Sequence, residues 1–174
     1  MTRNRVVVAL TALMLLPAFR ASAQDRQRPS FVGDVFTRVV ADPTTYTPAL
    51  LGFDATMRDW NSSQPFFQHG FHERNERFTI SGLPNDAPVS YGAGRRIIVA
   101  DALMSLERSV VNNLTDQIIE RILVERYPNH RKLVRTLGWA QRVSFASFKS
   151  YRLSVGHYRQ ARENEELARQ FGYR

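Results

Sequence analysis

Residues 94–127 read GRRIIVADALMSLERSVVNNLTDQIIERILVERY, a run with no proline and no glycine after Gly94, and Pro128 closes it. Apolar residues recur in it every three or four positions, which is the spacing of one face of an α-helix. This stripe consists of Leu103, Leu106, Val110, Leu114, Ile118 and Ile122. We predict one helix from about Tyr91, capped by Ser90 and roughly 50 Å long at about 1.5 Å per residue, with its stripe against the core.

A second long helix follows the break at Pro128-Asn129 and runs to about Phe171. Its stripe consists of Leu133, Leu137, Ala140, Ser144, Phe148, Tyr151, Val155 and Tyr158. Two long helices with so short a connection must run antiparallel. The predicted facing pairs are Lys132 with Glu125, Arg142 with Asp116, and His157 with Asp101.

Shorter helices precede this hairpin. Helical spacing of valines and phenylalanines predicts one over about 30–41, and Leu50, Phe53, Met57 and Trp60 predict another over about 48–61. We expect Ser62 to Pro65 to break that helix, and the residues from Arg77 to Ser90 have the composition of a loop. The predicted fold class is all-α: an antiparallel hairpin of two long helices whose apolar face is covered by two or three shorter N-terminal helices.

The N-terminus has the pattern of a secretory signal. Arg3 and Arg5 precede an apolar stretch from Val6 to Leu16, and Ala21-Ser22-Ala23 is a small-residue cleavage site. We predict a signal peptide over 1–23, a flexible leader over 24–30 and a single helical domain over 31–174. The alternative is an uncleaved membrane anchor, although the apolar run is shorter than the roughly 20 residues that span a bilayer.

Composition limits the classes of function. The chain has no cysteine, which excludes disulfides, thiolate metal sites and cysteine nucleophiles. The formal charge of its 174 residues is +8, and removal of the predicted signal leaves 21 basic and 16 acidic residues, a net charge of +5. This excess favours weak attraction to anionic surfaces. No nucleic-acid partner is expected, because the basic residues alternate with acids and no aromatic-rich binding motif accompanies them.

The densest polar cluster contains His69, His72 and Glu73. Two imidazoles three residues apart and a carboxylate are candidate metal ligands, although the spacing differs from that of an H-E-x-x-H helix. A hydrolase is a further alternative, with Glu73 as general acid and Asp54 or Asp59 as a second carboxylate. The structural interpretation is a polar loop that covers the aromatic residues around it. No cofactor motif is recognised, so no cofactor is expected.

Asp101 interrupts an apolar segment of the first long helix. A buried carboxylate is costly without a partner, so we predict a structural polar pair between Asp101 and His157, with Arg159 as the other candidate partner.

The run from Asp59 to Asn75 resembles a pattern in small bacterial proteins of unknown function. In those proteins an acidic residue, a few hydroxyl residues, a glycine and then Glu-x-Asn follow an N-terminal hydrophobic segment. Together with Glu120-Arg121, the residues from Arg126 to His130 and Gly138-Trp139, it is similar to exported helical proteins. The resemblance implies no particular activity. Some proteins with the shorter pattern are integral to membranes, and the charged long helices of this chain depart from them.

These observations lead to three hypotheses. The first is an exported, non-enzymatic scaffold of the cell envelope, whose partner is another envelope protein or an anionic membrane surface. The second is a metal-binding protein or hydrolase centred on His69, His72 and Glu73. The third is a membrane-associated helical protein that retains its N-terminal anchor.

Overall fold

The computed structural model describes residues 30–173, so the predicted signal peptide and nearly all of the leader lie outside the described residues. The helices are α2 (Phe31–Ala41), α3 (Thr47–Gln68), α4 (Tyr91–Arg126) and α5 (Arg131–Phe171). Short 3-10 turns lie at Pro43–Thr45 (η2), Glu76–Phe78 (η3) and Pro128–His130 (η4). The described chain contains no strands, which confirms the predicted all-α class.

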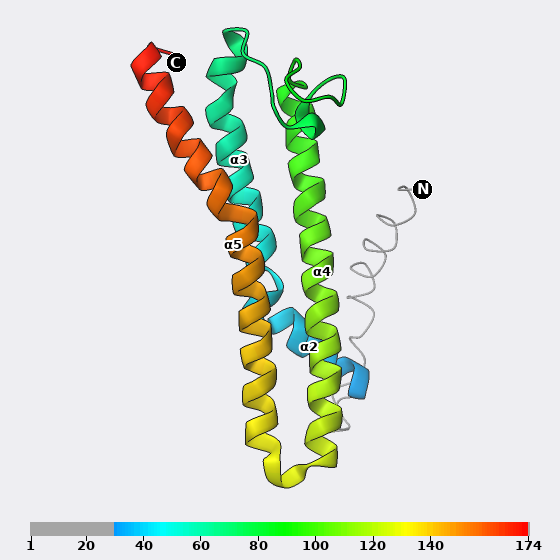
Figure 1. Cartoon of the computed structure of the whole chain (residues 1–174). Helices are drawn as coiled ribbons and strands as arrows, with labels where there is room; N and C mark the ends of the chain where they lie inside the picture. The colour runs from blue at the N-terminus through cyan, green and yellow to red at the C-terminus, as the bar shows by residue number, and fades with distance from the viewer. Residues whose placement is uncertain (1–29, 174) are drawn as a thin grey trace, which may run out of the picture.

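The two longest helices form the predicted antiparallel hairpin (Figure 1). The Ser90 side chain accepts a hydrogen bond from the Ala93 backbone N–H and begins α4, as expected for a capping serine. The η4 turn at Pro128 reverses the chain into α5. Arg142 of α5 forms an ion pair with Asp116 of α4, which confirms the predicted register near the turn.

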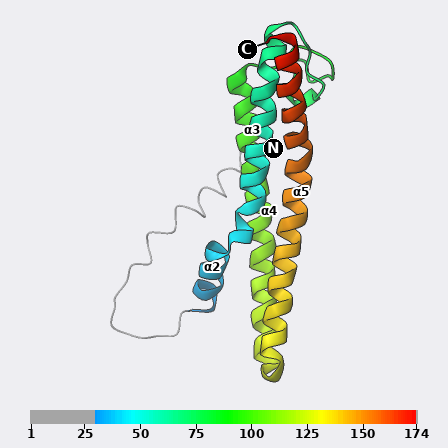
Figure 2. The same ribbon diagram turned by 90° about the vertical axis from the view of Figure 1, so that its left-hand side faces the viewer.

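The shorter helices pack on this hairpin at different heights. α3 lies between α4 and α5 at the end away from the turn, where α5 diverges from α4 (Figure 1). α2 lies beside the half of α4 nearer the turn (Figure 2). Because α3 separates the long helices at the end away from the turn, the facing pair predicted there, His157 with Asp101, does not form.

The predicted break at residues 62–65 is wrong, because α3 continues through Pro65 to Gln68. The hydroxyls of Ser62 and Ser63 both donate to the backbone oxygen of Asp59, so these polar side chains bond back into the helix instead of ending it. Phe66, the residue after the predicted break, is buried and holds the last turn of the helix in place. The helix ends at Gln68, and Gly70 just beyond it has a positive φ of 84°, which suits glycine.

The apolar core is small and lies at the upper end of the hairpin, that is, the end away from the turn. It consists of Trp60, Phe78 and Ile98, with Phe53, Met57, Phe67, Val89 and Ile97 packed around them. The Trp60 ring lies directly on the backbone of Gly94 in α4, and its Nε1–H donates to the Tyr91 oxygen at 3.3 Å. A side chain at position 94 has no room, so this glycine sets the approach of α3 to α4.

Both long helices bury the opposite face from the one predicted. α4 buries small and polar residues, namely Ser105, Ser109, Asn113, Gln117 and Glu120. None of the predicted stripe is fully buried: Leu103 and Ile122 are 56% and 51% exposed, and Leu106, Val110 and Ile118 are half-buried. On α5, Arg142, Ser150 and Ser154 are buried, whereas Leu137, Phe148 and Tyr151 are at least 60% exposed. The shorter helices pack on the hairpin as predicted, but the face of α4 and α5 that is buried is largely small and polar and is not the predicted apolar stripe.

Within residues 30–173, no helix is both long enough and apolar enough to cross a membrane.

Replacement of Gly94 by alanine tests the contact between α3 and α4. An added Cβ would lie 2.4 Å from Trp60 ring atoms, so we expect Gly94→Ala to lower the free energy of unfolding by about 1–3 kcal/mol, as overpacking does. Urea denaturation measures this loss.

Gly156→Ala is the matched control, because Gly156 lies inside α5 and a Cβ there meets no atom within 4 Å. The same change at Gly156 should raise the free energy of unfolding by about 0.5–1 kcal/mol through helix propensity. Equal effects at the two positions would contradict the close contact of Trp60 with α4.

Candidate functional site

Near the turn, the interior of the molecule is ionic. Arg142 of α5 has a side chain that is only 7% exposed and contacts three carboxylates. Its Nε donates to Asp42 at 2.9 Å, and its Nη1 donates to Glu120 at 3.0 Å and to Asp116. One guanidinium thus joins α5, α4 and the segment that links α2 to α3.

Local sequence explains how the ion cluster of Asp42, Asp116, Glu120 and Arg142 assembles. Asp116 and Glu120 lie one turn apart on the same face of α4. Asp42 is held in place because its Oδ1 also accepts from the Thr44 backbone N–H at 3.0 Å and caps η2. Gly138 of α5 provides the space, since a Cβ there would lie 2.6 Å from Glu120 Oε2.

Asn113 extends this polar interior by one turn of α4. It is fully buried, and its Nδ2 donates to Thr44 Oγ1 at 2.9 Å and to Thr45 Oγ1 at 2.8 Å. Thr45 in turn donates to the Val39 oxygen of α2 at 2.7 Å. The amide and hydroxyl groups therefore satisfy one another and anchor α2 and η2 on α4.

Burial changes the ionisation of the cluster. Desolvation raises the pKa of the Asp116 carboxyl, and the hydrogen bond from Arg142 offsets only part of this effect. For Arg142, burial acts to lower the pKa, but the hydrogen bonds to Glu120 and Asp116 outweigh it and the pKa is raised. Three carboxylates around one guanidinium carry excess negative charge, so the guanidinium stays charged and Asp116 binds a proton more readily than usual.

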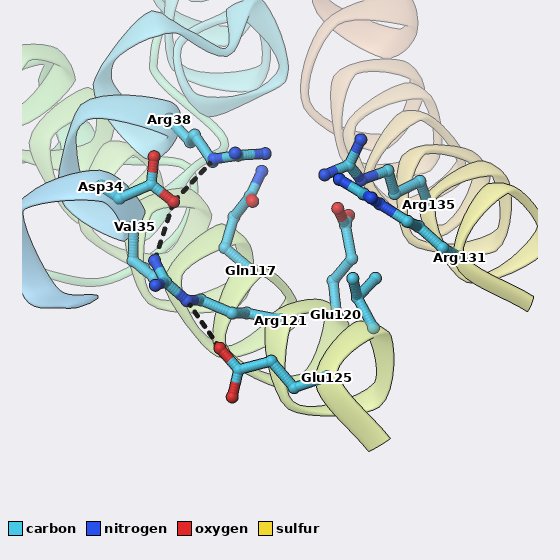
Figure 3. Close-up of a pocket in the computed structure, with 10 residues that line it drawn as sticks. Asp34, Val35, Arg38, Gln117, Glu120, Arg121, Glu125, Arg131 and Arg135 are labelled. Atoms are coloured by element: carbon cyan, nitrogen blue, oxygen red, sulfur yellow. Dashed lines mark hydrogen bonds and ion pairs between the residues drawn. The ribbon is translucent and has the colours of Figure 1, made fainter. Parts of the chain in front are cut away.

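A pocket of about 270 Å³ opens beside the ion cluster, between α2, α4 and the start of α5. Figure 3 shows four arginines around it, two beside the α2–α4 contact and two extending from α5. Arg121 bridges Asp34 at 2.9 Å and Glu125 at 3.3 Å, and Arg38 contacts Asp34 at 3.2 Å. The other two, Arg131 and Arg135, form no ion pair within residues 30–173.

A second polar network joins α3 to α5 at the upper end. Asp59 Oδ2 lies 2.7 Å from His157 Nδ1, and Asn164 Nδ2 donates to Ser62 and Ser63 at 3.2 and 3.0 Å. Because these groups bind one another, the network holds α5 on α3.

The same contact between α3 and α5 includes a tyrosine–carboxylate bond. Tyr158 donates to Asp54 at 2.8 Å, and this bond, with Arg58 beside it, lowers the pKa of Asp54. The same bond raises the pKa of Tyr158.

The structure does not bring His69, His72 and Glu73 together as metal ligands. The His69 ring stacks on Tyr173 at 3.7 Å between centroids, and its Nδ1 lies 2.7 Å from the Pro65 oxygen. Glu73 accepts from the Asn75 backbone N–H. Within the part of the chain that the structure describes, no three histidine or carboxylate side chains are arranged to hold a metal ion.

The predicted pair of Asp101 with His157 is wrong. Asp101 accepts from Arg77 at 2.6 Å near the surface, and His157 contacts Asp59. The cause is α3, which lies between the upper halves of α4 and α5 and supplies Asp59 to α5. Glu125 likewise pairs with Arg121 and not with Lys132.

Sequence reasoning found one contact of the ion cluster and missed the rest. The hairpin register predicted Arg142 beside Asp116. Asp42 precedes Pro43 as a helix-capping residue, and nothing in its local sequence places it against a residue 100 positions away. The signal that could have indicated the cluster is the position of Arg142. It shares one face of α5 with the small residues Ala146 and Ser150, which indicates a buried charge that needs partners.

Comparisons with family models, curated protein sequences and solved structures find no match to this chain. The resemblance to exported bacterial helical proteins stays a prediction.

Removal of the central guanidinium tests the ion cluster. Arg142→Met leaves buried carboxylates without their partner, so we expect it to lower the free energy of unfolding at neutral pH by about 3–5 kcal/mol. The folded-state pKa values of the carboxyls then rise above their unfolded values, and the folded state binds more protons. The loss should therefore shrink as the pH falls from 7.5 toward 5, as measured by urea denaturation at each pH.

Arg77→Met is the control, because the pair of Arg77 with Asp101 is exposed, with side chains 53% and 33% accessible. We expect a loss of less than about 1 kcal/mol there and little dependence on pH. A small, pH-independent loss in Arg142→Met would show that the cluster does not hold the helices together.

Proposed function

We propose that this chain is an exported, non-enzymatic helical scaffold of the cell envelope that acts as a homodimer. The observation that carries the proposal is the outward apolar face of the hairpin. We define this outer face by its exposed residues: Met104, Val111, Ile119 and Ile122 of α4, and Leu133, Leu137, Phe148, Tyr151 and Val155 of α5. Helical periodicity places them away from the residues that contact α2 and α3.

The spacing on α5 favours another helix as the occupant of this face. Leu137, Ser144 and Tyr151 lie seven residues apart, and Leu133 and Ala140 fall at the intervening positions of the same repeat. A seven-residue repeat keeps one stripe facing a partner helix along its whole length. The small residues Ala140 and Ser144 leave holes between the larger side chains, which suits interlocking helices better than a fluid lipid surface.

The exposed area is sufficient for a second copy of the chain. The nine side chains are between 44% and 64% exposed. At about 100 Å² each, they offer on the order of 800–900 Å² per copy, close to the roughly 800 Å² that each partner contributes to a stable interface. Exposure of this many large apolar side chains on one pair of helices favours association over a free monomer.

The basic residues of α5 determine which helices of the two copies face one another in the proposed dimer. From Arg131 to Tyr158, α5 contains Arg131, Lys132, Arg135, Arg142, Lys149 and Arg152 and no acidic residue. Two α5 helices in direct contact would bring like charges together. A two-fold axis parallel to the hairpin avoids this, because it places α4 of one copy over α5 of the other.

Export and the scaffold role rest on the N-terminal pattern of 1–23 and on the polar groups of the interior. The carboxylates around Arg142 and the imidazole of His157 form ion pairs or hydrogen bonds between helices. These contacts give the groups a structural role. An exported protein without cysteines depends on such packing and on association for its stability.

Leu137→Asp tests the proposed dimer. We expect the wild-type chain to sediment at twice the chain mass, and the charge in the outer face to weaken dimerisation at least about tenfold. Analytical ultracentrifugation over a range of protein concentrations measures the dissociation constant.

Leu50→Asp is the matched control, because Leu50 of α3 is 64% exposed, close to the 60% of Leu137, and lies outside the outer face. It should dimerise like the wild type. A wild-type chain that stays monomeric at every concentration would contradict the proposal, and so would a monomer that binds anionic lipid vesicles through this face.

A further inference from the structure

The pocket beside the ion cluster has the chemistry of an anion site. Its lining includes four arginines, Arg38, Arg121, Arg131 and Arg135, and three carboxylates, Asp34, Glu120 and Glu125. The remaining lining residues are Val35, Gln117 and Val124. The pocket is therefore basic by one formal charge, and the distribution of that charge decides what it can bind.

Each of the three carboxylates already contacts at least one guanidinium group. Asp34 contacts both Arg38 and Arg121, at 3.2 and 2.9 Å. Glu125 contacts Arg121 at 3.3 Å. Glu120 lines the pocket and accepts a hydrogen bond at 3.0 Å from Arg142, whose guanidinium it shares with Asp42 and Asp116.

Arg131 and Arg135 are the two arginines of the pocket lining that form no ion pair with a carboxylate of the lining. They lie one turn apart on α5, and Figure 3 shows both side chains extending toward the pocket from the side opposite Arg38. Neither forms an ion pair with any residue between 30 and 173. Two planar guanidinium forks on adjacent turns match the oxygens of a phosphate group, which they can bind in a bidentate manner.

The start of α5 adds to this positive field. α5 is 41 residues long, no side chain caps its N-terminus, and its first turn contains no acidic residue. The partial positive charge at a helix N-terminus therefore acts in the same direction as Arg131, which is the first residue of the helix.

We propose that this pocket binds a phosphate group, held between Arg131 and Arg135 of α5 and facing Gln117 of α4. The volume of about 270 Å³ admits a phosphate ester with a small polar body, such as a glycerol phosphate. The group comes either from a free phosphate ester or from a phospholipid headgroup. This inference does not depend on the proposed dimer.

Calorimetric titration of the full chain with glycerol 3-phosphate tests the site. We expect saturable one-to-one binding that weakens with added salt and is lost at least tenfold in the double variant Arg131→Gln/Arg135→Gln. The control is Arg152→Gln/Arg159→Gln, which removes the same charge from exposed positions of α5 outside the pocket and should bind like the wild type.

A parallel titration with vesicles of phosphatidylglycerol identifies the source. Tighter binding to the vesicles, again lost only in the pocket variant, assigns the phosphate to a lipid headgroup, and tighter binding to glycerol 3-phosphate assigns it to a free ester. Equal losses in the two double variants would overturn the site, because they would reflect net charge alone. So would the absence of saturable binding in both titrations. The monomeric variant Leu137→Asp should retain binding, which separates this result from the test of the dimer.

Discussion

The buried guanidinium of Arg142 is the interaction on which the rest of the structure depends. It is held by carboxylates from α4 and from the segment between α2 and α3, so a single side chain fixes three parts of the chain at one place. A buried charge is tolerated only when it is fully paired. Near the turn, the face of each long helix that carries these charged groups must therefore point inward. The opposite face of each helix then points outward.

The apolar stripes point outward as a consequence. Where Asn113, Glu120 and Arg142 occupy the interior, the leucines and aromatics of the same helices lie on the far side. The small apolar core around Trp60 stabilises the upper end, where α3 replaces the direct contact of α4 with α5. Polar networks between helices and exposed apolar side chains are the combination on which the proposed homodimer rests.

The sequence predicted the elements well because their signals are local. Ser90 and Pro128 bound α4, and the unbroken periodicity between them is sufficient for a long helix. The register near the turn also followed from the short connection. Periodicity shows that a helix has two faces but does not show which one is buried, since that depends on partners from elsewhere in the chain. Asp42 and Trp60 are such partners, and their contacts with α5 and α4 leave no mark in the local sequence.

The central claim is that the polar face of the hairpin is its interior and the apolar face its contact surface. The chain has no cysteine, so a single introduced cysteine reports on one position by its rate of reaction with a thiol reagent. Ser109 lies on the buried face of α4, and Ser144 lies on the exposed side of α5 between Leu137 and Tyr151. The account predicts that Ser109→Cys is protected at every protein concentration, and that Ser144→Cys reacts quickly in dilute solution and more slowly as concentration rises. Rapid reaction at Ser109→Cys with protection of Ser144→Cys in dilute solution would contradict it.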